Sequence, residues 1–190
     1  MYPNVQTLGY IDTGHGNVTN ATVRAQIATY AGWKNVTKGL ALHGIYFDQT
    51  PWKDDEDGVA KAYLRNVSAT VRHTDGWARP GEGLVVHNPG RVPDAEMMAY
   101  RPDIVVVYEG TYEDMPSRER LHAQVAEAKG DRKDYAMLVH SVPKDLHRGG
   151  LRKILERIRR DVEWLYVTDL VVDEYAGYGS LLELWLSVAW

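Results

Sequence analysis

Residues 103–109 read DIVVVYE, and this run gives the clearest indication of the fold class. Its apolar residues are followed by a carboxylate, Glu109. Residues 42–48 (LHGIYFD) are likewise mostly apolar and end in a carboxylate, Asp48. A short apolar run without strict alternation is typical of a strand buried on both faces, as in a parallel sheet. Further runs of this kind occupy residues 5–11, 83–88, 135–140 and 163–169.

Helical patterns lie between these runs. They cover residues 19–33, 54–73, 116–129, 149–160 and 179–190, and residues 93–100 are expected to form a short turn or helix. The first carries Val23, Ile27 and Tyr30 on one face. The second begins with the acidic run DDED, which suits the positive end of a helix dipole. Its apolar face is expected to consist of Val59, Tyr63, Val67 and Val71. Gly130 is the expected C-cap of the helix over 116–129.

Alternation of six strands with six helices predicts right-handed βαβ crossovers and an α/β fold with a parallel sheet. No linker or low-complexity segment interrupts the series, so residues 1–190 are expected to form a single domain. The pattern alone fits both an open doubly wound sheet and part of a TIM-type (β/α)8 barrel. The sequence GHGN after Asp12 is not a Gly-rich phosphate loop, which argues against a nucleotide-binding sheet.

Composition excludes several classes of function. The net charge of −4 gives no electrostatic basis for binding nucleic acid or an anionic membrane. No apolar run approaches the ~18 residues of a membrane span, and the opening MYPNVQTLGY lacks the features of a signal peptide. Without cysteine there is no disulfide, no thiolate nucleophile and no zinc–thiolate site.

Asparagine usage points to an extracellular location. Four of the six asparagines begin an N-x-[ST] sequon, where roughly one in eight would do so by chance. They are Asn17, Asn20, Asn35 and Asn66. We therefore expect a secreted or cell-surface protein, with any targeting segment outside this chain.

Polar residues end almost every predicted strand. They are Asp12, Asp48 and Gln49, His87 and Asn88, Glu109, His140, and Thr168 and Asp169. In a parallel barrel these ends converge on the face where active sites are built. A single strand-terminal Asp or Asn also serves as a helix or turn cap, but a full set of polar ends predicts a site. Trp52, Tyr112 and Tyr10, just beyond strand ends, are candidates for stacking on sugar rings.

Asp48 and Glu109 are the expected catalytic residues, because each follows an apolar strand. Two carboxylates in different surroundings divide into nucleophile and proton donor in glycoside hydrolysis. The same groups, with Asp12 or Asp169, could instead hold a divalent cation. The histidines lack metal-ligand spacing, and Ser141 lacks a G-x-S-x-G elbow, which removes a serine hydrolase. We expect no metal and no cofactor.

Five motifs in order resemble the spherulin-4 (spherulation-specific) family. They are NVQTLGYIDTGHGN, GIYFDQT, VVHNPG, DIVVVYEGTY and YVTD, and the resemblance runs from about Val5 to the C-terminus. It implies a TIM-like barrel, and some members are fungal glycoside hydrolases that cleave α-1,4-linked N-acetylgalactosamine or galactosamine polymers of the extracellular matrix. By this similarity Asp48 is nucleophile or transition-state stabiliser, and Glu109 is the general acid/base.

Two departures from the family pattern matter. Gln49 replaces the Glu of the family's F-D-E motif, and glutamine cannot ionise. The chain also supplies only strands three to eight of the family's barrel, so it is expected to be truncated at its N-terminus relative to the family. Two unpaired parallel edges would then be open to self-association.

Three functions remain from the sequence. The first is a glycosidase on an amino-sugar polysaccharide. The second is a catalytically impaired cell-surface or matrix protein that binds the same polysaccharide, which Gln49 favours. The third is a hydrolase that depends on a divalent metal.

Overall fold

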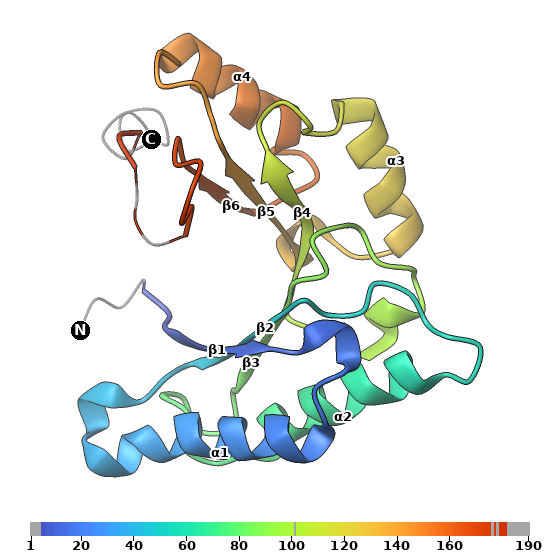
Figure 1. Ribbon diagram of the computed structural model, residues 1–190, viewed down its shortest axis with the longest axis vertical. Coiled ribbons are helices and arrows are strands. Elements are labelled where there is room, and N and C mark those ends of the chain that lie inside the picture. Colours follow the sequence, from blue (N-terminus) through green and yellow to red (C-terminus); the bar gives the residue numbers. More distant parts are fainter. Residues whose placement is uncertain (1–4, 101, 176, 178, 182–190) are drawn as a thin grey trace. The chain divides into compact units, whose positions relative to one another are not determined.

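The fold alternates strands and helices along the chain (Figure 1). The computed structural model describes residues 5–100, 102–175, 177 and 179–181. The strands are β1 (Leu8–Asp12), β2 (Gly44–Asp48), β3 (Leu84–His87), β4 (Ile104–Thr111), β5 (Tyr135–His140) and β6 (Trp164–Val167). The helices are α1 (Asn20–Val36), α2 (Val59–His73), α3 (Arg118–Ala128) and α4 (Arg148–Ile158). Each of the six predicted strands is present, so the prediction of an α/β fold is confirmed.

The strands follow one another in the sheet in chain order, β1-β2-β3-β4-β5-β6, and are parallel. The register of β1 with β2 places Asp12 opposite Asp48 and Tyr10 opposite Tyr46. Backbone contacts divide the chain into two compact units. Unit 1 contains residues 1–89 and 93–105, and unit 2 contains residues 90–92 and 106–190. The expectation of a single domain over 1–190 stays a prediction.

In unit 1, α1 and α2 lie side by side against strands β1–β3 (Figure 1). Alternate strand residues such as Ile11, Ile45 and Phe47 are buried in one cluster with the apolar faces of the helices. Because side chains alternate along a strand, the residues between them, Tyr10, Asp12, Tyr46 and Asp48, face away from the helices. These four residues are exposed or half-buried. The polar face of the sheet is therefore separate from the core of unit 1.

The predicted start of the second helix was wrong. α2 begins at Val59, and the acidic run precedes it as a loop. Two of its carboxylates still bind backbone N–H groups in the first turn of α2. Asp55 Oδ1 accepts from the N–H of Val59 at 2.6 Å, and Asp54 Oδ1 accepts from the N–H of Lys61 at 3.0 Å. Val59 is 61% exposed, since this position precedes the buried stripe. Leu64 extends the buried face that Tyr63, Val67 and Val71 form as predicted.

Unit 2 contains the parallel pair β5 and β6 together with α3 and α4. Each helix buries an apolar stripe, Leu121 and Val125 on α3 and Leu151, Ile154 and Ile158 on α4. The expected C-cap at Gly130 was wrong by one residue, because Lys129 takes the left-handed conformation with φ 61°. The N–H of Gly130 instead donates to the Tyr135 hydroxyl at 2.7 Å.

The remaining predicted helices have mixed outcomes. Residues 93–100 contain a 3-10 helix, Met97–Tyr100, as a short turn or helix was expected there. Most of the helix predicted over 179–190 lies outside the described residues, and residues 179–181 are not helical.

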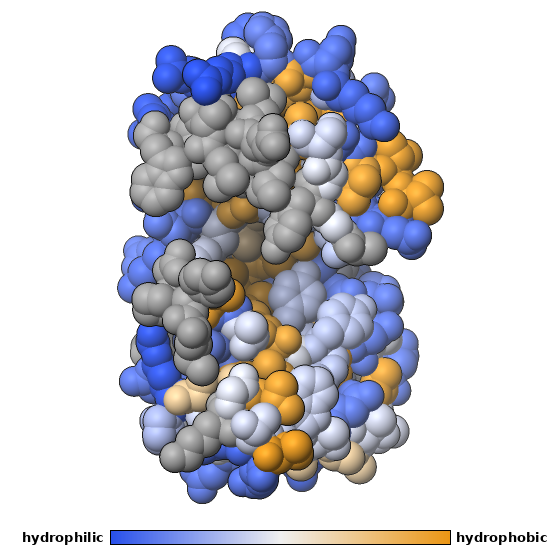
Figure 2. All heavy atoms as spheres, turned by 90° about the vertical axis from the view of Figure 1, so that its left-hand side faces the viewer, coloured by the Kyte–Doolittle hydropathy of each residue, from blue (hydrophilic) through white to orange (hydrophobic). Residues whose placement is uncertain are grey.

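Within the described ranges, no helix combines the length and apolar character needed to cross a membrane. Hydrophilic side chains surround separate apolar patches on the face drawn in Figure 2.

Candidate active site

Asp48 accepts three hydrogen bonds at the end of its strand. It is the last residue of β2 and is half-buried. Its Oδ1 accepts from the Gln49 N–H at 2.9 Å and from Asn88 Nδ2 at 2.7 Å, and its Oδ2 accepts from the Tyr10 hydroxyl at 2.7 Å. All three donors are neutral. They fix the orientation of the carboxylate without neutralising its charge.

Gln49 connects Asp48 to Asp12. Its backbone is left-handed, with φ 49°, which is unusual for a residue with a Cβ. The Gln49 carbonyl accepts from Thr13 Oγ1 at 2.7 Å and from the His15 N–H at 2.8 Å, and these bonds hold this conformation. Its side-chain Nε2 donates to Asp12 Oδ2 at 3.3 Å. One strained residue therefore contacts both carboxylates, one with its backbone and one with its side chain.

Two tyrosine rings lie beside Asp48 on the same face of the sheet. The rings of Tyr10 and Tyr46 are nearly parallel, at 16°, with centroids 6.2 Å apart, and Tyr10 is 54% exposed. Tyr30, on α1, connects this helix to β1, since its hydroxyl donates to the Tyr10 carbonyl at 2.9 Å. A Cβ on Gly9 would lie 2.7 Å from the Tyr30 ring, so only glycine fits there. Sequence reasoning selected Tyr10 and missed Tyr46, although the two-residue period from Asp48 places it on this face.

The other predicted residues near Asp48 divide into two groups. Asn88 is 2% exposed and orients Asp48. His87 is 3% exposed and points the other way, where its Nε2 lies 3.0 Å from Ser68 Oγ on α2. Burial, with the positive charge of Arg72, lowers the pKa of His87 to about 3. The ring is therefore neutral and belongs to the core. Trp52 is half-buried, with Lys53 Nζ 5.2 Å from its ring centroid.

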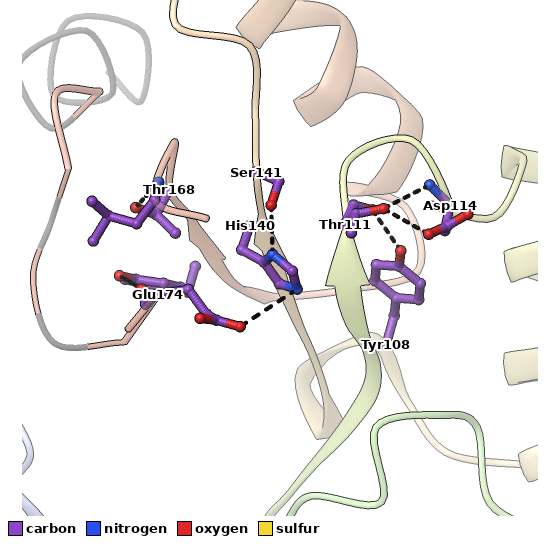
Figure 3. Close-up of polar contacts among 9 residues, drawn as sticks. Tyr108, Thr111, Asp114, His140, Ser141, Thr168 and Glu174 are labelled. Atoms are coloured by element: carbon purple, nitrogen blue, oxygen red, sulfur yellow. Dashed lines mark hydrogen bonds and ion pairs between the residues drawn. The ribbon is translucent and has the colours of Figure 1, made fainter. Parts of the chain in front are cut away.

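Glu109 lies in unit 2, inside β4 and two residues before the end of that strand. It is half-buried, and its N–H donates to the Gly90 carbonyl at 3.2 Å. Hydrogen bonds tie down the turn that follows. The Tyr108 hydroxyl donates to the Thr111 carbonyl at 2.6 Å, and Thr111 Oγ1 to Asp114 Oδ2 at 2.7 Å (Figure 3). Burial, with the charge of Asp114, raises the pKa of Tyr108, so its hydroxyl stays a donor.

His140 ends β5 and is joined to two residues that sequence reasoning did not select. Its Nδ1 lies 2.9 Å from Ser141 Oγ, and its Nε2 lies 3.9 Å from Glu174 Oε1 (Figure 3). Ser141 is left-handed, with φ 55°. The predicted Tyr112 joins this group through its N–H, which donates to the His140 carbonyl at 2.9 Å. Glu174 follows no strand directly, so the polar-end pattern could not identify it.

Thr168 and Asp169 follow β6, are buried, and hydrogen-bond to other residues of the chain. They are 0% and 3% exposed. Asp169 accepts from the N–H of Ser180 at 2.7 Å and from its Oγ at 2.6 Å. Burial acts to raise the pKa of Asp169, but the hydrogen bonds from Ser180, together with a backbone hydrogen bond and the charge of Lys144, hold the pKa below its usual value. The geometry gives both residues a part in holding the loop.

The structure thus joins Tyr10, Asp12, Asp48, Gln49 and Asn88 in one network within unit 1. Among the residues that the structure describes, no group of three or more His, Cys, Asp or Glu side chains is arranged to hold a metal ion. Within that part of the chain, no group of side chains supports the alternative of a hydrolase that depends on a divalent metal.

Parallel strands in chain order, with helices between them and carboxylates at or near the strand ends, define a TIM-like α/β protein. The chain belongs to spherulation-specific family 4 (Spherulin4), whose family model matches residues 1–189. The crystal structure of Aspergillus clavatus Sph3 in complex with GalNAc is similar to it, with a TM-score of 0.87 and 33% sequence identity. The similarity covers 98% of this chain and 73% of that one. No curated protein matches the sequence.

Proposed function

We propose that the protein is a glycoside hydrolase that acts on α-1,4-linked polymers of N-acetylgalactosamine or galactosamine. One observation carries the proposal: a hydrogen-bonded carboxylate, Asp48, stands beside an exposed aromatic ring in a fold similar to that of a protein crystallised with GalNAc. We assign Asp48 as nucleophile or transition-state stabiliser and Glu109 as general acid/base.

Asp48 suits a role in which the carboxylate acts as an anion. Glycoside cleavage passes through an oxocarbenium-like transition state, which a fixed carboxylate stabilises or attacks. Because Asn88, Tyr10 and the backbone of Gln49 already hold Asp48 in place, little reorganisation is needed as charge develops on the sugar. None of these donors is a cation that would cancel the negative charge.

Glu109 suits the transfer of a proton. It is only half-buried, and its strand and its N–H bond to Gly90 fix the position of its backbone. A general acid gives its proton to the leaving oxygen and later takes one from water. The side chain of a glutamate in this position can perform both steps, whereas glutamine can perform neither.

The paired rings suit the sugar itself. Tyrosine offers an apolar ring face together with a polar hydroxyl, and here the Tyr10 hydroxyl contacts Asp48 while its ring stays exposed. A sugar on Tyr10 would therefore lie next to the carboxylate. Asp12, through its acceptor oxygens, adds a partner for the hydroxyl or amino groups of the substrate.

Gln49 supports an alternative, a protein that binds the same polysaccharide without cleaving it. Its amide donates to Asp12, where a carboxylate would face a like charge instead. If turnover in this family needs an acid at this position, the chain keeps the binding groups and lacks the chemistry. Binding by Tyr10, Asp12 and Asn88 would then survive the loss of Asp48 or Glu109.

We also propose that the protein acts outside the cell, where such polymers occur, and that it self-associates through unpaired strand edges. The sequons support the extracellular location, and β1 supports self-association, because among the described strands it pairs only with β2.

The decisive experiment incubates the protein with an α-1,4-linked galactosamine and N-acetylgalactosamine polymer and measures reducing ends. The Asp48→Asn and Glu109→Gln variants are expected to release none. Asp75→Asn and Glu113→Gln, which change exposed acids, are the matched controls and keep full activity. Binding to the same polymer is measured by calorimetry for each variant. If the unaltered protein binds the polymer without hydrolysing it, the alternative is selected. If the unaltered protein neither binds nor hydrolyses the polymer, the proposal is overturned.

A further inference from the structure

The four N-x-[ST] sequons all lie in unit 1, on the two helices and the loop before the first of them. Their surroundings differ sharply. We propose that Asn17 and Asn35 carry N-linked glycans and that Asn20 and Asn66 do not. This proposal rests on the extracellular location proposed above, because glycan transfer takes place in the secretory pathway.

Asn35 has the most open position of the four. It lies in the last turn of α1 and is exposed, and the next residue, Val36, is 77% exposed. The third residue of the sequon, Thr37, already has an extended backbone, with φ −160° and ψ 143°. The buried residues of this helix, which include Val23 and Ile27, do not reach its last turn. A glycan on Asn35 therefore extends into solvent without displacing any core residue.

Asn17 is also exposed, in the loop between β1 and α1. Its Nδ2 donates to the Gly14 carbonyl at 2.7 Å. An amide nitrogen has two hydrogens, and glycan attachment replaces only one of them. The bond to Gly14 can therefore be kept when the sugar is attached. The threonine of this sequon, Thr19, remains free after transfer to cap α1, where its Oγ1 accepts from the Thr22 N–H at 3.2 Å.

Asn20 is the first residue of α1 and lies on the buried side of the helix. It precedes Val23 by three residues and Ile27 by seven, which places the three side chains on one face. Its Oδ1 is fully buried and has no hydrogen-bond partner among the residues that the structure describes. The residue as a whole is half-buried, and its amide group has its oxygen turned away from solvent. We therefore expect the first turn of α1 to leave no room for a sugar on this side chain.

Asn66 lies in the middle of α2 and is half-buried. The serine of its sequon, Ser68, is 2% exposed and faces His87 at 3.0 Å. The carbonyl of Asn66 accepts from Thr70 Oγ1 at 2.8 Å, inside the helix. Glycan transfer needs the sequon in an accessible, extended form, whereas this segment folds as a helix with its serine in the core.

The reaction is a group transfer from a lipid-pyrophosphate-linked oligosaccharide. The asparagine Nδ2 attacks the anomeric carbon of the first sugar, and a C–N bond forms as the C–O bond to the pyrophosphate breaks. The amide proton leaves to the medium and the lipid pyrophosphate departs as the anion. No oxidant or reductant is involved.

The test expresses the full chain behind a host secretion signal in yeast and maps the glycans on the secreted protein. Enzymatic removal of N-glycans in ¹⁸O-water converts each occupied asparagine to a labelled aspartate, which mass spectrometry locates. We expect the label at Asn17 and Asn35. Asn17→Gln and Asn35→Gln each remove one glycan-sized step in gel mobility, and the matched Asn20→Gln and Asn66→Gln remove none.

Label at Asn20 or Asn66, or none at Asn17 or at Asn35, overturns the proposal. The glycan map needs no substrate, and hydrolysis can be measured on unglycosylated protein made in bacteria. A failure of the proposed enzymatic function therefore leaves this result intact, and the reverse also holds.

Discussion

Asp48 and Asp169 are both carboxylates at the carboxyl ends of parallel strands, yet the structure uses them in opposite ways. Asp48 is half-buried and takes its hydrogen bonds from the strand end itself and from Tyr10 and Asn88. Asp169 is 3% exposed, and Ser180, eleven residues further along the chain, occupies both of its oxygens.

The difference shows that polarity at a strand end does not by itself mark a site. What decides is whether the following loop passes beside the carboxylate or folds back over it. After Asp48 the chain continues through the left-handed Gln49, whose side chain donates to Asp12. After Asp169 it returns at Gly179, where an added Cβ would clash with Asp169 Oδ1. One carboxylate remains available to a ligand and the other holds a loop.

The same substitution at both positions should separate the two roles most strongly. Asp48→Asn is expected to lower the hydrolysis rate by at least about 10³-fold, as losses of a reacting carboxylate do. Asp169→Asn should leave the rate within about threefold but lower the free energy of unfolding by about 1–2 kcal/mol, because one Ser180 bond is lost. Initial rates and urea unfolding measure both. Equal loss of activity in the two variants would contradict the distinction.

The close return of the loop at Gly179 can be tested by adding a methyl group. Gly179→Ala places a Cβ against Asp169 at a residue with φ +62° and should lower the free energy of unfolding by about 3 kcal/mol. Gly32→Ala is the matched control, because Gly32 lies within α1 and no atom of the described part of the chain lies within 4 Å of the added carbon. That change should stabilise the protein by about 0.5–1 kcal/mol. A Gly179→Ala variant as stable as the original would refute the packing argument.

A third strand-end residue, His87, predicts a pH dependence of stability. Burial lowers its folded pKa to about 3 from the usual 6.5. Below pH 6.5 the unfolded chain binds a proton that the folded chain does not, so stability falls as pH falls, by about 1.4 kcal/mol per pH unit. Between pH 6.5 and pH 5 this histidine should account for a loss of about 2 kcal/mol.

His87→Gln should remove that part of the pH dependence, because glutamine can still bond to Ser68 but cannot take a proton. Urea unfolding at the two pH values gives the comparison. His147→Gln removes an exposed histidine and is the control. An equal change of slope in the control would show that His87 is not the cause.

The fold followed from the sequence because its signals are local. Apolar runs such as 103–109 and 135–140 predicted β4 and β5 within two residues. The start of α2 was misplaced because acidic residues favour a helix N-terminus both inside the first turn and just before it. Asp54 and Asp55 cap α2 from the preceding loop, a choice that depends on the left-handed Gly58 and is invisible in the charge pattern.

The candidate site could be predicted only in part. The strand ends identified Asp12, Asp48 and Gln49, which the structure joins by hydrogen bonds. The sequence could not show that His87 points to the helices while Asn88, one residue later, points to Asp48, since alternation fixes opposite faces but not which face is which. Glu174 reaches His140 through the tertiary path of a loop, and no local pattern encodes that path.

Tyr10 offers the finest test of how Asp48 is presented, because its ring and its hydroxyl can be separated. Tyr10→Phe keeps the exposed ring over Tyr46 and removes the donor to Asp48 Oδ2. If that bond orients the carboxylate for the transition state, kcat should fall about tenfold with KM nearly unchanged, a loss of ~1.4 kcal/mol in the range of hydrogen bonds to charged groups. Tyr10→Leu should in addition raise KM, because the ring face is lost as well.

Tyr30→Phe, which removes a hydroxyl bound to the Tyr10 carbonyl, is the control for mere loosening of the strand. Equal kinetic losses in Tyr10→Phe and Tyr30→Phe would mean that the tyrosine only supports β1, and Asp48 would then depend on Asn88 and the Gln49 backbone alone.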